Sequence, residues 1–190
     1  GTMELTRRLQ ERLTPPAPDK PEVKVFANLF RLGDKVMQIK NNYDIIWKKD
    51  EEENGVGVFN GDIGEIIEIV PPQEAVGGNA QIIVSFDDQI VEYEQDALSY
   101  LTHAYCMSVH KSQGNEYPVV VMVVLPQHRF MLDRRLLYTG ITRARRALIL
   151  LGDPALFSAA LAQEEREVRD TTLQQRLARQ YVPLMMENDE

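Results

Sequence analysis

The chain has 190 residues, of which 44% are apolar and 26% charged, and it is long enough to bury a core without disulfides or metals. No apolar run approaches the roughly 20 residues that a membrane helix needs, so we expect no membrane partner. The single cysteine, Cys106, cannot form an internal disulfide and fits a reducing compartment, so we expect a cytoplasmic protein. No Cys and His spacing suits zinc, and we expect no metal site.

The net charge of −8 hides a strong segregation along the chain. Residues 43–102 carry two positive and fourteen negative charges, whereas residues 103–150 carry seven positive and two negative charges and all three histidines. A basic block between acidic blocks is compatible with one surface that faces phosphate. The plainer interpretation is a solvated charge pattern with no partner.

The first forty residues predict one helix and one strand. Leucines at four-residue spacing predict an amphipathic helix over 3–14, and prolines at 15, 16, 18 and 21 predict a stiff connector after it. The apolar residues of 34–39 predict a short, largely buried strand. A polar turn is expected at 41–44, and the charge run at 48–54 predicts a solvated loop tip.

Residues 55–100 have the pattern of an all-β module of SH3-like size. Asn60-Gly61 indicates a turn, and β-branched residues predict a strand over 66–70. A loop is expected at 71–80, and the strands 82–86 and 90–93 around Asp87-Asp88 predict a hairpin. The segment carries most of the negative charge, so its whole face is a poor track for a phosphate backbone. The acidic face is either solvated or binds a basic partner protein.

Residues 103–160 have an α/β pattern. Continuous apolar runs at 119–125 and 147–151 are typical of strands covered on both faces of a parallel sheet. A helix is predicted over 134–146 with Asp133 as its N-cap, and Asp153-Pro154 indicates the start of a final helix. The tail from 161 is predicted to be helical to about residue 180.

The first segment with chemical potential is Ser108-Val-His-Lys-Ser-Gln-Gly-Asn-Glu116, expected between a strand at 105–107 and the strand at 119. Polar loops at a sheet edge bind ligands in α/β proteins, and these side chains can donate to phosphate or bases. The alternative is a helix-capping loop with surface polar residues. A serine nucleophile is excluded, because no carboxylate is arranged with His110 and Ser108 lacks a nucleophile elbow.

The second segment is Leu136-Leu-Tyr-Thr-Gly-Ile-Thr-Arg-Ala-Arg-Arg146. On the predicted helix its apolar residues share one face, and Thr142, Arg143 and Arg146 point away from it. Arginines on one face repel one another unless an anion joins them, and phosphate suits guanidinium groups. The alternative is that these arginines pair with the acidic module or the tail.

Together, these segments resemble a known family. Ala104-Tyr-Cys-Met-Ser-Val-His-Lys-Ser-Gln-Gly-Asn-Glu116 resembles motif V of superfamily 1 helicases, and Leu137-Tyr-Thr-Gly-Ile-Thr-Arg-Ala-Arg145 resembles motif VI. Gly33-Asp-Lys-Val-Met-Gln-Ile-Lys-Asn-Asn-Tyr-Asp44 and Val58-Phe-Asn-Gly-Asp-Ile-Gly-Glu65 narrow the resemblance to the RecD-like branch, over roughly residues 4–180.

The resemblance implies an α/β fold: part of a RecA-like parallel sheet domain with an inserted all-β SH3-like barrel. The family has two such motor domains, binds ATP between them, translocates 5′ to 3′ on single-stranded DNA and unwinds duplexes in repair and recombination. The expected division of the chain is an N-terminal helix and connector at 1–21, motor domain 2A at 22–47 and 101–182, the SH3-like 2B insertion at 48–100, and a frayed tail at 183–190.

The resemblance also implies roles for particular residues. Arg143 matches the arginine finger that reaches the γ-phosphate. The residues expected near the nucleotide are Glu116, Gln113 and Thr142. The residues expected near DNA are Ser108, His110 and Lys111. Arg145 and Arg146 are left with a structural or DNA-proximal role.

One feature of an ATPase is missing. The chain has no Gly-x-x-x-x-Gly-Lys-Ser/Thr loop, and no acidic pair follows the run at 119–125. We therefore expect a fragment that does not hydrolyse ATP alone, because ATP and Mg²⁺ would be bound mainly by an N-terminal RecA-like domain of the same polypeptide. The alternative is a degenerate, non-catalytic module that binds a partner through its β barrel.

Overall fold

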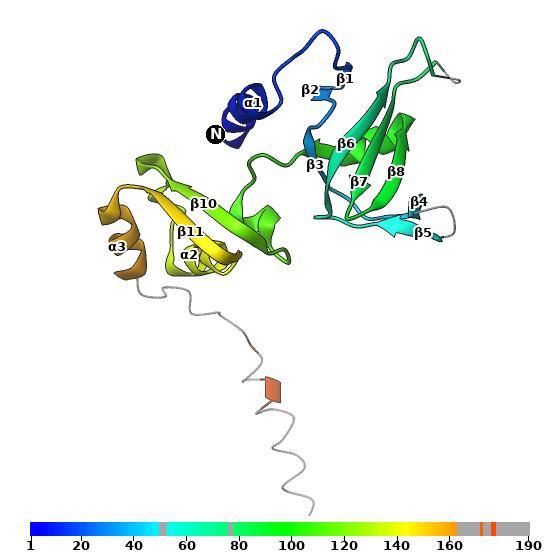
Figure 1. Cartoon of the computed structure of the whole chain (residues 1–190). Helices are drawn as coiled ribbons and strands as arrows, with labels where there is room; N and C mark the ends of the chain where they lie inside the picture. Colours follow the sequence, from blue (N-terminus) through cyan, green and yellow to red (C-terminus); the bar gives the residue numbers. More distant parts are fainter. Residues whose placement is uncertain (50–52, 76–77, 163–171, 173–175, 178–190) are drawn as a thin grey trace, which may run out of the picture. The chain divides into compact units, whose positions relative to one another are not determined.

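The computed structural model describes residues 1–49, 53–75, 78–162, 172 and 176–177 (Figure 1). After the helix α1 (Thr2–Leu13), the elements up to residue 103 are β1 (Glu22–Val25), β2 (Asn28–Arg31), β3 (Lys35–Gln38), β4 (Asn42–Lys49), β5 (Glu53–Val58), β6 (Ile63–Val70), β7 (Gln81–Phe86), β8 (Gln89–Glu94), the 3₁₀ helix η1 (Gln95–Tyr100) and β9 (Leu101–His103). They are followed by η2 (Val109–Ser112), β10 (Tyr117–Val124), η3 (Pro126–His128), α2 (Arg134–Ile141), β11 (Ala144–Gly152) and α3 (Pro154–Ala162). The chain divides into two compact units, 1–123 with 138–151 and 124–137 with 152–190, and the site described below lies in the first.

Strands β3 to β9 form one antiparallel sheet in the order β5-β4-β8-β7-β6-β3-β9. We call residues 35–103, which hold this sheet, the β module. The predicted hairpin is confirmed as β7 and β8, in which Ile82 pairs with Tyr93. Asp87 and Asp88 have φ values of 44° and 74°, as a two-residue type I′ turn requires.

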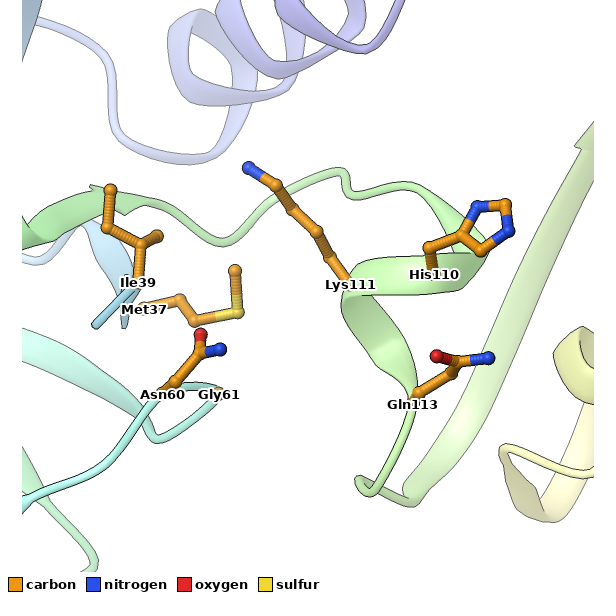
Figure 2. Close-up of a pocket in the computed structure, with 7 residues that line it drawn as sticks. All are labelled: Met37, Ile39, Asn60, Gly61, His110, Lys111 and Gln113. Carbon is orange, nitrogen blue, oxygen red and sulfur yellow. The ribbon is translucent and has the colours of Figure 1, made fainter. Parts of the chain in front are cut away.

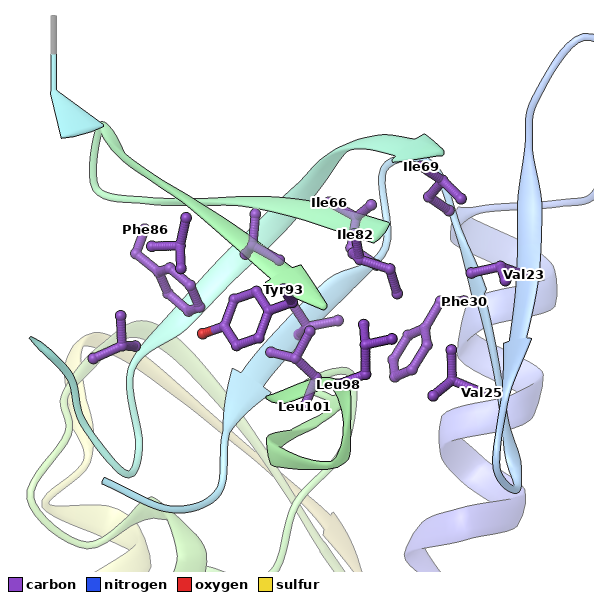
Figure 3. Packing of buried hydrophobic residues seen from close by; sticks show 14 residues of the cluster. Val23, Val25, Phe30, Ile66, Ile69, Ile82, Phe86, Tyr93, Leu98 and Leu101 are labelled. Atoms are coloured by element: carbon purple, nitrogen blue, oxygen red, sulfur yellow. The ribbon is translucent and has the colours of Figure 1, made fainter. Parts of the chain in front are cut away.

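The core lies under this sheet, and the hairpin β1–β2 adds side chains to it (Figure 3). Burial alternates along β7, whose Ile82, Val84 and Phe86 face the core. Tyr93 is fully buried, and its hydroxyl donates to Gln38 Oε1 at 2.9 Å. Burial raises the pKa of Tyr93 far above its ordinary value, so the hydroxyl stays a donor.

Two local expectations in this region are wrong. The turn predicted at 41–44 is instead the start of β4, which begins at Asn42. The loop tip predicted at 48–54 is wrong for residues 48–49 and 53–54, which belong to β4 and β5, whereas residues 50–52 lie outside the described part of the chain. In both cases cross-strand hydrogen bonds hold polar residues in extended conformation, and cross-strand pairing is not visible in local composition.

The expected boundary between 47 and 48 falls inside β4. This strand pairs with β5 from Trp47 opposite Gly55 to Lys49 opposite Glu53, and also with β8. Strand β3 pairs with both β6 and β9. The sheet therefore contains residues from both sides of that boundary, and the assignment of residues to a motor domain and an insertion stays a prediction.

A buried polar cluster fixes α1, the predicted N-terminal helix, to the β module. The Asp34 carboxylate is fully buried and accepts hydrogen bonds from Gln10 Nε2 at 2.6 Å, the Arg31 backbone N–H at 2.8 Å and the Tyr105 hydroxyl at 2.9 Å. His103 Nε2 lies 3.3 Å from the same carboxylate. Burial acts to raise the pKa of Asp34, but the hydrogen bonds outweigh it and the pKa lies below its ordinary value.

Strands β10 and β11 form a parallel pair joined by α2. Where both strands begin, the Tyr117 N–H donates to the Arg143 carbonyl at 2.8 Å. The prediction that these strands are covered on both faces is wrong for the described residues, because Val119 and Val121 are each 53% exposed and Ile149 is 47% exposed. A two-stranded sheet with one crossover helix has too few neighbours to bury both faces.

Helix α2 is shorter than predicted. It ends at Ile141 instead of residue 146, and β11 begins at Ala144. The backbone of residues 144–152 is hydrogen-bonded to β10 as strand β11. Pairing with a distant strand therefore overrides the helical propensity of Ala144-Arg-Arg-Ala147.

Both predicted helix caps are confirmed. Asp133 Oδ1 accepts the Leu136 N–H at 2.7 Å, and Asp153 Oδ1 accepts the Ala155 N–H at 2.9 Å. The tail predicted to be helical to about residue 180 lies outside the described residues after Ala162, apart from 172 and 176–177.

Within the described ranges, no helix is long and apolar enough to cross a membrane. The same residues contain no group of three or more His, Cys, Asp or Glu side chains placed to hold a metal ion.

Candidate functional site

The segment that enters the site leaves the sheet immediately after β9. The strand predicted over 105–107 is wrong, because β9 ends at His103. The apolar residues that suggested a strand are held by side-chain contacts instead: the Thr6 hydroxyl of α1 donates to the Cys106 carbonyl at 3.4 Å, and the Tyr105 hydroxyl donates to the carboxylate of Asp34, which directly precedes β3. The entry to residue 108 is therefore fixed by contacts with α1 and Asp34.

Residues 108–114 form a one-turn helix and a tight turn. Ser108 is the N-cap of η2, and its hydroxyl accepts the Lys111 N–H at 3.4 Å. The buried Ser112 hydroxyl donates to the Val109 carbonyl at 2.7 Å, and Gly114 has a φ of 89°, which favours glycine. This is the capping loop considered from the sequence, and it leaves the side chains of His110 and Lys111 exposed.

A pocket of about 400 Å³ lies between this loop and the β module (Figure 2). Its lining residues come from two walls, Met37, Ile39, Asn60 and Gly61 on the β module and His110, Lys111 and Gln113 on the loop. Among the described residues, none of those that line it is a carboxylate, although the β module is strongly acidic. Figure 2 shows the Lys111 side chain extending toward the β-module wall, whereas the His110 ring points away from it.

Asn115 joins the loop to the β module. Its Nδ2 donates to the Gly61 carbonyl at 2.9 Å. Gly61 has a φ of 102°, and a Cβ there would lie 3.0 Å from Asn115 Nδ2, so the predicted Asn60-Gly61 turn is confirmed and needs its glycine. Sequence reasoning identified the turn but not its contact with Asn115, and no local signal would have revealed it.

Arg143 lies just beyond the C-terminus of α2 and is half-buried. Its Nε donates to the Thr139 carbonyl at 3.1 Å, its Nη1 to the Asn115 carbonyl at 3.0 Å and its Nη2 to Thr142 Oγ1 at 3.2 Å. All three partners are neutral oxygens. Within the described residues, the charge of this guanidinium is therefore positioned by the protein without being neutralised by a carboxylate.

The other arginines of this segment have different environments. Arg145 Nε donates to the Glu116 carboxylate at 2.7 Å, and both side chains are more than half exposed. Arg146 is exposed on β11, so the prediction that it shares a helix face with Arg143 is wrong.

The structure thus separates the predicted site residues into two groups. The ends of the two segments meet: Arg143, which also bonds Thr142, donates to the carbonyl of residue 115, and Arg145 bonds Glu116. His110, Lys111 and Gln113 line the pocket, whereas Ser108 is absent from its lining and acts as a cap. The β-module wall of the pocket was not predicted, because its residues come from strands and turns distant in sequence.

Two family models match the chain. Residues 103–151 match the UvrD-like helicase C-terminal domain, and residues 5–86 match the ATP-dependent RecD-like DNA helicase SH3 domain. The first match contains both polar segments, and the second contains most of α1 and most of the β module.

Curated relatives resemble the chain over much of its length. The ATP-dependent RecD2 DNA helicase of Deinococcus radiodurans is 33% identical over 84% of this chain and 20% of its own length. The RecBCD enzyme subunit RecD of Haemophilus influenzae is 30% identical over 60% of this chain and 16% of its own length. The conjugal transfer protein TraA of Agrobacterium fabrum is 32% identical over 76% of this chain and 12% of its own length. The chain spans a fifth or less of the length of these relatives. Because it contains both polar segments and matches both family models, it belongs to the RecD-like helicase family.

Proposed function

We propose that this chain is part of the second motor domain of an ATP-dependent DNA helicase and that Arg143 is its arginine finger. The observation that carries the proposal is the environment of Arg143, whose three hydrogen-bond acceptors are all neutral. An arginine finger has to present an uncompensated positive charge in a fixed position, because its effect depends on meeting charge that develops in the transition state.

Arg143 has N–H donors available for that role. A guanidinium has five N–H donors, and three of them are engaged here. The other two can contact phosphate oxygens without breaking the bonds that position the group. ATP with Mg²⁺ would supply the phosphoryl group to be transferred, and an arginine in this role typically contributes ~10³–10⁵ in rate.

The chain's own residues suit one side of a nucleotide site. Thr142 and Glu116 are the further candidates for that side, and the Glu116 carboxylate is oriented by Arg145. Gln113, which was expected near the nucleotide, lines the pocket beside Lys111 instead. No phosphate-cradling loop occurs in the sequence, so we propose that an N-terminal RecA-like domain holds most of ATP and Mg²⁺ and that this chain alone does not turn over ATP.

The DNA side of the proposal uses the pocket and the loop beside it. Lys111 supplies a cation, the partly exposed Ile39 supplies an apolar surface for a base, and none of the described residues that line the pocket is a carboxylate that would repel phosphate. Single-stranded nucleic acid is bound by this combination of positive charge and apolar contact. Ser108 and His110 are further candidates for the same strand, and 5′ to 3′ translocation is proposed from the family alone.

The test is ATP turnover by the full-length helicase with and without single-stranded DNA. Arg143→Ala is expected to abolish most stimulated turnover while leaving DNA affinity unchanged. Arg12→Ala is the matched control, because it removes the same charge from an exposed position on α1. Unchanged turnover in Arg143→Ala would refute the finger assignment. Absence of stimulated turnover in the wild type would favour the degenerate binding module.

A further inference from the structure

We propose that Asn115 is a positioning residue that couples the pocket wall of the β module to Arg143. The inference rests on the proposed function of Arg143. Asn115 contacts the β module through its side chain and Arg143 through its backbone carbonyl. One residue thus connects the proposed DNA side to the proposed nucleotide side.

The β-module end of this connection is firmly held. Gly61, which accepts the Asn115 amide, donates its own N–H to the Gln38 carbonyl at 2.9 Å. The side chain of Gln38 is fully buried and bonded to the Tyr93 hydroxyl inside the core. The turn at Gly61 is hydrogen-bonded to the buried Gln38. The hydrogen bond from the Asn115 side-chain amide to the Gly61 carbonyl therefore holds residue 115 against a well-ordered part of the β module.

The other end sets the place of the guanidinium. The Asn115 carbonyl accepts Arg143 Nη1 at 3.0 Å, and two residues later the Tyr117 N–H donates to the Arg143 carbonyl at 2.8 Å. The segment 115–117 therefore holds both the side chain and the backbone of Arg143. The backbone N–H of Asn115 has only a local bond, to the Ser112 carbonyl at 3.2 Å. The side-chain bond to Gly61 joins this segment to the β module.

Asparagine fits this position chemically. Its amide donates to a carbonyl, which an aspartate carboxylate of the same shape cannot do. Gly61 also lines the pocket, so a DNA strand bound in the pocket would contact the turn to which Asn115 is hydrogen-bonded. A shift of the turn would be transmitted to the Arg143 guanidinium through residue 115.

The experiment measures kcat for ATP, and the affinity for an oligothymidine, in the full-length helicase. Asn115→Ala and Asn115→Asp are expected to lower kcat by up to about 100-fold, because small misplacements of a reacting group have effects of this size. The affinity for the oligothymidine is expected to stay at the wild-type value. Asn54→Ala, which changes an exposed asparagine on the edge strand β5, is the matched control with wild-type kcat.

A double mutant separates positioning from a general structural effect. Lysine lacks the planar guanidinium that donates to the carbonyl of residue 115. In an Arg143→Lys variant, Asn115→Ala is therefore expected to cause no further loss of kcat. If the double mutant lost kcat by the product of the two single-mutant fold-decreases, the inference would be overturned. Unchanged kcat in both Asn115 variants would overturn it as well. If Arg143→Ala itself leaves turnover unchanged, the proposed function fails first, so the two failures are distinguishable.

Discussion

Replacing Asp34 by alanine removes the acceptor at the centre of the cluster that holds α1. Gln10 Nε2 keeps a second acceptor in the Leu29 carbonyl at 2.8 Å, and the Tyr105 hydroxyl keeps its contact with Thr14. The Arg31 backbone N–H loses its buried carboxylate acceptor, and no other group of the cluster accepts a hydrogen bond from it. The helix and the entry to the candidate site are therefore loosened together.

The magnitude follows from the number of bonds to a buried charge. Three hydrogen bonds to the Asp34 carboxylate are lost, each worth about 1.5–3 kcal/mol before relaxation, and partial rescue leaves about 3–5 kcal/mol of destabilisation. For a chain of this size, each kcal/mol lowers Tm by about 2–4 °C. Asp34→Ala is thus expected to lower Tm by about 6–20 °C.

The assay is thermal unfolding followed by circular dichroism, at neutral and at acid pH. The pKa of Asp34 is lowered in the folded state, so its contribution is present above the unfolded pKa of about 3.9 and is lost as pH falls through the folded value. The isosteric Asp34→Asn keeps the volume but should lose this part of the acid dependence. Asp44→Ala, at an exposed position, is the control. A Tm for Asp34→Ala within about 2 °C of wild type at neutral pH would refute the energetic role of the cluster.

Three smaller changes test other contacts by the same melting assay. Asn115→Ala removes the bond to Gly61 and should cost about 0.5–1.5 kcal/mol, and a larger loss would mean that the residue has a wider structural role. Gly64→Ala places a Cβ 2.5 Å from the Ser85 carbonyl and should cost about 1–3 kcal/mol, whereas a neutral result would show that β6 and β7 can separate there. Asp88→Gly relieves a φ of 74° and should raise stability by up to about 1 kcal/mol, so a lower Tm would reveal a contact of the Asp88 side chain.

Local signals sufficed for much of the β module. Asn60-Gly61 and Asp87-Asp88 indicated turns because few residue pairs tolerate the positive φ values found there. The β-branched and apolar runs at 82–86 and 90–93 predicted the two strands of the hairpin, which the structure confirms as β7 and β8. These features depend on neighbours in sequence, which is why composition and spacing were enough.

The errors arise where a distant partner decides the conformation. Residues 144–146 have helical propensity but pair with β10, and 105–107 are apolar but are held by side-chain contacts with α1 and Asp34. The contact between Asn115 and Gly61 joins positions 54 residues apart, and nothing local marks either as a partner of the other. The motifs located the candidate site, whereas the contact that connects it to the β module required the fold.

The exposed valines of β10 affect how the proposed binding of this chain to DNA has to be measured. Val119, Val121 and Val123 offer apolar surface in the described structure, and association through such surface strengthens in sulfate and other kosmotropic salts. Contacts between cations such as Lys111 and phosphate weaken as ionic strength rises. A titration in sulfate would therefore increase self-association while reducing DNA affinity. Chloride titrations with the molecular mass monitored in parallel would separate the two effects.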